Sequence, residues 1–72
     1  MGRRLDKVKG IPIEQRKLLI DQWVFNEKNR NLAKRKLIDG VSFEQIAGEY
    51  QLSVNQTKNI VRDVIEVMCE KI

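Results

Sequence analysis

The sequence predicts a small all-α domain of four helices, preceded by a basic N-terminal arm. Apolar residues recur at helical spacing rather than in alternation, two serine–glutamine pairs have the spacing of capping boxes, and no segment has the pattern of a strand. The chain has 72 residues, which is enough for one domain with a small core. We therefore expect a flexible arm over residues 1–10 and a helical domain over residues 11–72.

The first ten residues have no periodic apolar face. Arginine, lysine and glycine dominate this segment, and Leu5 and Val8 are its apolar residues after the initial methionine. Because such a segment has little to bury, we expect it to be a mobile basic arm.

The first helix is expected from about residue 13 to residue 25. Pro12 fits a first helical turn, and Glu14 complements the positive end of the helix dipole. The apolar residues that follow have helical spacing: Ile13, Leu19, Ile20, Trp23 and Val24.

A second helix follows a bend that is rich in asparagine. Three asparagines between residues 26 and 31 favour turns and caps. The helical pattern then resumes at Leu32, Ala33, Leu37 and Ile38. Gly40 suits the left-handed conformation that terminates a helix, which puts the boundary near Asp39.

Two capping boxes begin the last two helices. Ser42 precedes Gln45 by three residues, and Ser53 precedes Gln56 by the same spacing. The short helix between the two boxes has one apolar face, made of Phe43, Ile46, Ala47 and Tyr50. Residues 51 and 52 remain for the connection to the last helix, which starts at Val54.

The last helix has two apolar stripes when its residues are placed at steps of about 100°. One stripe consists of Thr57, Ile60, Val64 and Val67, and the other consists of Val61, Ile65, Met68 and Ile72. The second stripe has the spacing of a coiled-coil seam, so we expect it to hold a homodimer. The alternative is that both stripes pack inside one chain, against Trp23 of the first helix.

The composition argues against several classes of protein. With no histidine and one cysteine, neither a metal site nor an internal disulfide is expected. The chain offers no nucleophile–base pair and no glycine-rich phosphate loop, so we expect no enzyme activity and no cofactor. No apolar segment approaches the roughly 20 residues of a membrane span, and we expect a cytoplasmic protein that does not interact with a membrane.

Positive charge is concentrated in two short segments. The net charge is +4, but residues 1–10 carry +3 and residues 28–37 carry +5. Such clusters suit a polyanion, because contacts with phosphates release counterions.

Residues 37–62 resemble the helix-turn-helix of sigma-factor region 4 and of related phage and plasmid regulators. The residues that carry this resemblance are Ile46, Ala47, Tyr50, Leu52 and Ser53. Gln51 stands where the family favours glycine, and Thr57 stands where valine or isoleucine is usual. We therefore expect Gln51 to adopt a strained backbone conformation, or the turn to differ in detail.

The resemblance implies sequence-specific binding of double-stranded DNA, with the helix that starts at Val54 in the major groove. Family positions that approach bases are matched by Val54, Asn55 and Lys58. Together with polar neighbours on this helix, the candidate base contacts are Val54, Asn55, Gln56, Lys58, Asn59 and Arg62.

Two further groups of basic residues are candidate DNA contacts. A basic cluster that leads into the second helix is expected to clamp the DNA backbone; its members are Lys28, Arg30, Lys34, Arg35 and Lys36. An ordinary solvated helix is the alternative. The basic residues of the arm, Arg3, Arg4, Lys7 and Lys9, are expected to enter a minor groove, with a disordered solubilising tail as the alternative.

The most direct interpretation is a transcriptional regulator of phage, plasmid or mobile-element type. A second interpretation is an interaction protein that binds RNA polymerase or another regulator through a sigma-like helical surface. A third interpretation is a DNA-binding factor for plasmid partition or excision, since such factors use similar domains.

Overall fold

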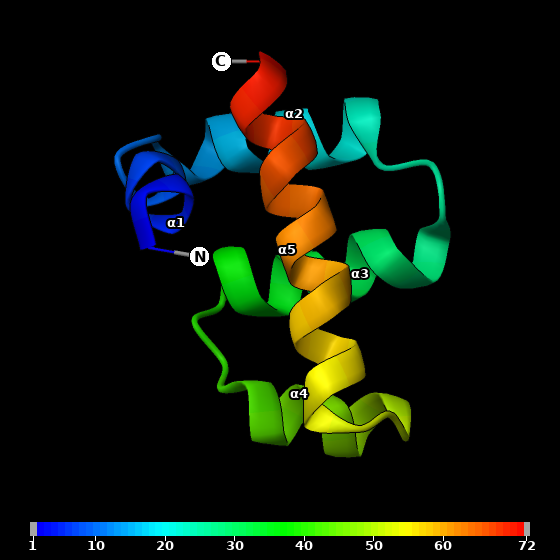
Figure 1. Ribbon diagram of the computed structural model, residues 1–72. Coiled ribbons are helices and arrows are strands. Elements are labelled where there is room, and N and C mark those ends of the chain that lie inside the picture. Colours follow the sequence, from blue (N-terminus) through cyan, green and yellow to red (C-terminus); the bar gives the residue numbers. More distant parts are fainter. Residues whose placement is uncertain (1, 72) are drawn as a thin grey trace.

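The computed structural model describes the backbone of residues 2–71 and the side chains of residues 6–71. These residues form five helices and no strand, which confirms the all-α class: α1 (Gly2–Lys9), α2 (Ile13–Trp23), α3 (Glu27–Leu37), α4 (Phe43–Tyr50) and α5 (Val54–Lys71). In Figure 1, α5 runs the length of the molecule, with α4 at its N-terminal end and α2 towards its C-terminal end.

The core is built around α5. Each of the other four helices packs against it, and its buried residues are Thr57, Val61, Val64, Ile65 and Met68. The fully buried apolar residues of the other helices are Val8, Ile20, Leu32, Ala33 and Ile46. Burying one large aliphatic side chain is worth roughly 1.5–3 kcal/mol, so the packing of these residues contributes substantially to the stability of this small domain.

The stripe expected to hold a homodimer lies inside the monomer. Val61 and Met68 are fully buried, and Ile65 is 1% exposed; Ile72 lies outside the described residues. The prediction of this seam was therefore wrong. The reason is that α1 is folded against α5, so α5 has one more packing neighbour than the four-helix prediction allowed.

The N-terminal segment differs most from the prediction, since residues 2–9 form α1 rather than a mobile arm. Val8 is fully buried and Ile11 is 8% exposed, and the Ile11 N–H donates to the Val8 carbonyl at 3.0 Å. Arg16 of α2 fixes the end of the helix by donating to the carbonyls of Lys9 at 2.7 Å and Ile11 at 2.8 Å. The packed domain therefore includes α1.

Helix boundaries follow the predicted caps closely. Ser53 and Gln56 form a complete capping box: each backbone N–H donates to the other side chain at 3.1 Å. The Ser42 hydroxyl accepts from the N–H of Gln45 at 3.2 Å, but the Gln45 side chain turns to Glu49, so this box is half formed. Gly40 has a φ of 72°, as expected for a residue that ends a helix.

The packing of α1 predicts a clear effect of shortening Val8. Val8→Ala should lower the free energy of unfolding by about 2 kcal/mol, because it leaves a cavity in contact with the core. Thermal melting followed by circular dichroism measures the change. Lys7→Ala is the control, since Lys7 is exposed in the same helix and its substitution should change stability by less than about 0.5 kcal/mol. Equal stability of both variants would mean that residues 2–9 do not pack.

Candidate nucleic-acid interface

The turn between α4 and α5 has the geometry expected from its sequence. Gln51 has φ 55° and ψ 44°, in the left-handed region, as its place at a glycine-favouring position predicted. The N–H of Leu52 donates to the Ala47 carbonyl at 2.9 Å, a bond that closes the end of α4. The left-handed conformation costs an L-residue roughly 1–2 kcal/mol, and the packing on both sides of the turn offsets this cost.

Small and apolar side chains fill the angle between α4 and α5. Ala47 is 4% exposed, Ile46 and Thr57 are fully buried, and Leu52 and Ile60 pack at the edge. The hydroxyl of Thr57 donates to the Ser53 carbonyl at 3.0 Å. This bond satisfies a buried polar group and explains how threonine occupies a position where valine or isoleucine is usual.

The polar side of α5 faces solvent at its N-terminal half. The exposed side chains there are Asn55, Lys58, Asn59 and Arg62. Gln56 is also exposed, but its side-chain oxygen is committed to the capping box, and Val54 is half-buried. The structure therefore brings four of the six candidate base contacts together as exposed groups and gives Gln56 a structural role.

Lys34 and Arg35, two of the residues expected to clamp DNA, form internal ion pairs. Lys34 Nζ lies 2.5 Å from a carboxylate oxygen of Asp21 in α2. Arg35 binds both oxygens of Glu49 in α4, at 3.0 and 2.5 Å, and also Asp39 at 3.2 Å. These contacts tie α3 to α2 and α4, and they neutralise part of the charge cluster seen in the sequence.

The two hydrogen bonds between the Arg35 guanidinium and the Glu49 carboxylate shift the pKa of both side chains. The hydrogen bonds from Arg35 hold the pKa of the Glu49 carboxyl below its ordinary value. The same bond, with Asp39 adding to it, raises the pKa of Arg35. Both side chains are about one-third exposed, so solvent screens the pair and its contribution to stability is modest.

Two other lysines lie over an aromatic ring next to this face. Lys36 Nζ is 4.5 Å and Lys58 Nζ is 5.8 Å from the centroid of the Phe43 ring. In the sequence, Phe43 is recognisable only as part of the apolar face of the short helix between the two capping boxes. No local pattern marks its contact with the lysines, because it joins α3, α4 and α5.

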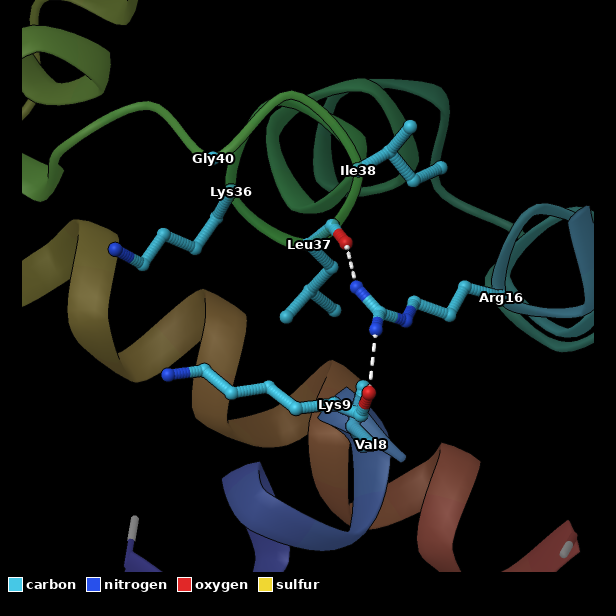
Figure 2. Close-up of a pocket in the computed structure, with 7 residues that line it drawn as sticks. All are labelled: Val8, Lys9, Arg16, Lys36, Leu37, Ile38 and Gly40. Atoms are coloured by element: carbon cyan, nitrogen blue, oxygen red, sulfur yellow. Dashed lines mark hydrogen bonds between the residues drawn. The ribbon is translucent and has the colours of Figure 1, made fainter. Parts of the chain in front are cut away.

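A cavity beside Lys36 is lined in part by Arg16. Its lining consists of Val8, Lys9, Arg16, Lys36, Leu37, Ile38 and Gly40. Figure 2 shows the Arg16 guanidinium between the carbonyls of Lys9 and Leu37, to which it donates at 2.7 and 2.8 Å. Arg3 and Arg4 lie in α1, and their side chains are outside the part that the structure describes.

A separate surface is apolar. Phe25 is 82% exposed and Trp23 is 40% exposed, with Lys71 Nζ 4.2 Å from the centroid of the Trp23 ring. Both aromatic residues line a groove together with Ile60, Val64 and Val67 of α5. The other residues at this groove are Val24, Asn26, Asn29 and Asp63.

The described residues contain neither a membrane-spanning helix nor a cluster of metal ligands. No helix among them is both long and apolar enough to cross a membrane. Over the same residues, no three histidine, cysteine, aspartate or glutamate side chains cluster in a way that would hold a metal ion.

Comparison with known proteins identifies no relative. The chain matches no protein-family model, and no curated protein or solved structure is significantly similar to it. The functional assignment therefore depends on the chain's own geometry.

The Arg35–Glu49 pair predicts a pH-dependent difference between the wild type and Glu49→Gln. Because the folded-state pKa of Glu49 is lowered, its contribution is fully present above the ordinary glutamate pKa of about 4.3. It is lost as the pH falls through the lowered value. The wild type should melt above Glu49→Gln at neutral pH, and the difference should shrink below about pH 4.

Melting temperatures between neutral pH and about pH 3 measure this difference. Glu70→Gln is the control, because Glu70 is exposed near the end of α5, away from α3 and α4. A wild type and Glu49→Gln that melt together at every pH would show that the pair does not stabilise the fold.

Proposed function

We propose that the protein binds double-stranded DNA sequence-specifically and reads the major groove with the N-terminal half of α5. The observation that carries the proposal is the α4–turn–α5 unit, a tight helix pair that leaves one polar side of its second helix exposed. In helix-turn-helix proteins this second helix enters the major groove, and its N-terminal residues contact base edges.

The exposed side chains of α5 have suitable chemistry for this task. An asparagine such as Asn55 or Asn59 can bind the N6 and N7 edge of adenine with two hydrogen bonds, and Arg62 can bind guanine in the same way. The positive end of the α5 dipole adds attraction for phosphate. No acidic residue interrupts the helix before Asp63, so its first half is free of like-charge repulsion against DNA.

The biological role that we propose is regulation of transcription in the cytoplasm, in a phage, plasmid or mobile-element setting. The resemblance to sigma-factor region 4 supports this role. A DNA-binding factor for plasmid partition or excision would have the same interface and differ in its target sequence.

Selection of bound sequences from a random duplex pool tests the proposal. We expect a recovered motif, and on that motif Asn55→Ala and Arg62→Ala should each weaken binding by about 5- to 150-fold, the equivalent of roughly 1–3 kcal/mol per lost base contact. Gln22→Ala, an exposed substitution on α2, is the control and should bind normally. Recovery of no motif, or unchanged affinity of both variants, would reject recognition through α5.

The proposed homodimer needs a surface other than the buried stripe of α5. We assign it to the groove at Trp23 and Phe25, with a second copy as its occupant. Ile60 and Val67 at this groove lie roughly 160–180° around α5 from Lys58, at about 100° per residue, so pairing there leaves the lysine side free.

The second candidate function, binding to RNA polymerase or another regulator, is favoured by the same exposed aromatic pair. Contiguous exposed apolar surface with a polar rim is typical of protein–protein contacts. A second copy of the chain and a different partner protein at this groove can be distinguished by mass, because a homodimer doubles the mass of the purified protein in solution.

Sedimentation at tens of micromolar decides between these occupants. We expect a dimer for the wild type and a monomer for Phe25→Asp with unchanged helicity, because Phe25 is 82% exposed and supports no core contact. Leu18→Asp is the matched control, since Leu18 is exposed on α2 outside the groove, and it should remain a dimer. A monomeric wild type would overturn the homodimer, and Phe25-dependent co-purification with polymerase would then favour the second function.

A further inference from the structure

Two lysines from different helices are held at one aromatic ring beside the polar side of α5. Lys36 Nζ and Lys58 Nζ lie 4.5 and 5.8 Å from the Phe43 centroid, so the two nitrogens are at most about 10 Å apart, the sum of these distances. Attraction to the ring limits the freedom of long side chains. Positive charge is thereby concentrated between the end of α3 and the second turn of α5.

These two charges have no counter-ion within the described part of the chain. Among residues 6–71, the ion pairs with carboxylates involve Lys34 and Arg35. Neither Lys36 nor Lys58 has a described carboxylate oxygen within 4.0 Å. Since like charges repel at this separation, an anion placed between them lowers the electrostatic energy of the surface.

Lys9 extends the same positive surface from α1. It lines one cavity with Lys36, and in Figure 2 both side chains extend in the same direction, towards the side where α5 passes. Arg16 shares the cavity, but each of its three guanidinium nitrogens donates to a backbone carbonyl, those of Lys9, Ile11 and Leu37. The arginine is therefore structural, whereas the lysine ammonium groups remain available.

We propose that Lys36 and Lys58, positioned by Phe43, bind backbone phosphate of duplex DNA, and that Lys9 continues this contact along the same strand. The inference rests on the proposed function, because it takes the ligand to be the DNA that α5 reads. Phosphates of one strand follow each other every 3.4 Å along the helix axis, so nitrogens at most about 10 Å apart reach one phosphate or its close neighbours. Lys58 is thus assigned to the backbone rather than to a base.

The salt dependence of binding to a fluorescent duplex of random sequence tests this site. Each lost phosphate contact should lower the slope of log affinity against log salt concentration by about 1. Lys36→Gln, Lys58→Gln and Lys9→Gln should show this decrease, and should weaken binding to selected and random duplexes by the same factor. Lys17→Gln removes an equal charge from an exposed position on α2 and should leave the slope unchanged.

Phe43→Leu tests positioning separately from charge. It retains both lysines and an apolar side chain, so the slope should stay as in the wild type while affinity falls about 2- to 5-fold through loss of the ring contact. Circular dichroism shows whether Phe43→Leu folds. If it does not fold, the test of the phosphate site depends on the lysine variants, whose substitutions are at the surface. Unchanged affinity of folded Phe43→Leu would overturn the role of the ring.

The outcomes separate this site from the proposed function. If the wild type selects a DNA motif but the Lys36→Gln, Lys58→Gln double variant has the same salt slope as the wild type, the phosphate site is overturned and the proposed function stands. If the wild type shows no sequence preference but its salt slope still depends on these lysines, the phosphate site is supported and recognition of base sequence by α5 is rejected. Tighter binding to single-stranded RNA of the same length than to the duplex, or an equal decrease in Lys17→Gln, overturns the assignment.

Discussion

The stripe of Val61, Ile65 and Met68 on α5 is buried by the helices packed around it, whereas the polar side of α5 is free and Ile60 and Val67 are half-buried at the groove. Every other element takes its position from that burial, including the turn that joins α4 to α5. The free side is divided by charge: Lys58 and Arg62 lie in its first half, and Asp63 and Glu70 lie further along. A polyanion is therefore attracted to the N-terminal end of α5 and repelled beyond it.

The sequence predicted the parts of the fold that depend on neighbouring residues. The capping box at Ser53, the helix end at Gly40 and the left-handed turn at Gln51 were each expected and are each present. These features are set by a few consecutive residues, whose side chains and backbone interact over short distances whatever surrounds them. The exposed polar side of α5 was predicted for the same reason, from helical periodicity alone.

The features that the sequence did not predict depend on residues far apart in the chain. Arg16 binds the carbonyl of Leu37, which is 21 residues away, and Arg35 binds Glu49, which is 14 residues away. A count of charges cannot separate such internal pairs from charges that remain available for a ligand. The spacing of Val61, Ile65 and Met68 was equally ambiguous, because a coiled-coil seam and an interior helix side have the same period.

The three hydrogen bonds of Arg16 have a consequence for the thermodynamics of any binding that uses α1. A mobile arm loses roughly 1–2 kcal/mol of backbone entropy for each residue that a ligand orders. Arg16 and the buried Val8 hold the end of α1 in place before any ligand arrives, so the entropy of ordering this segment is already included in the free energy of folding. The backbone of Lys9 is thus preorganised, so that a ligand bound by Lys9 would order only the side chain and not the backbone of this segment.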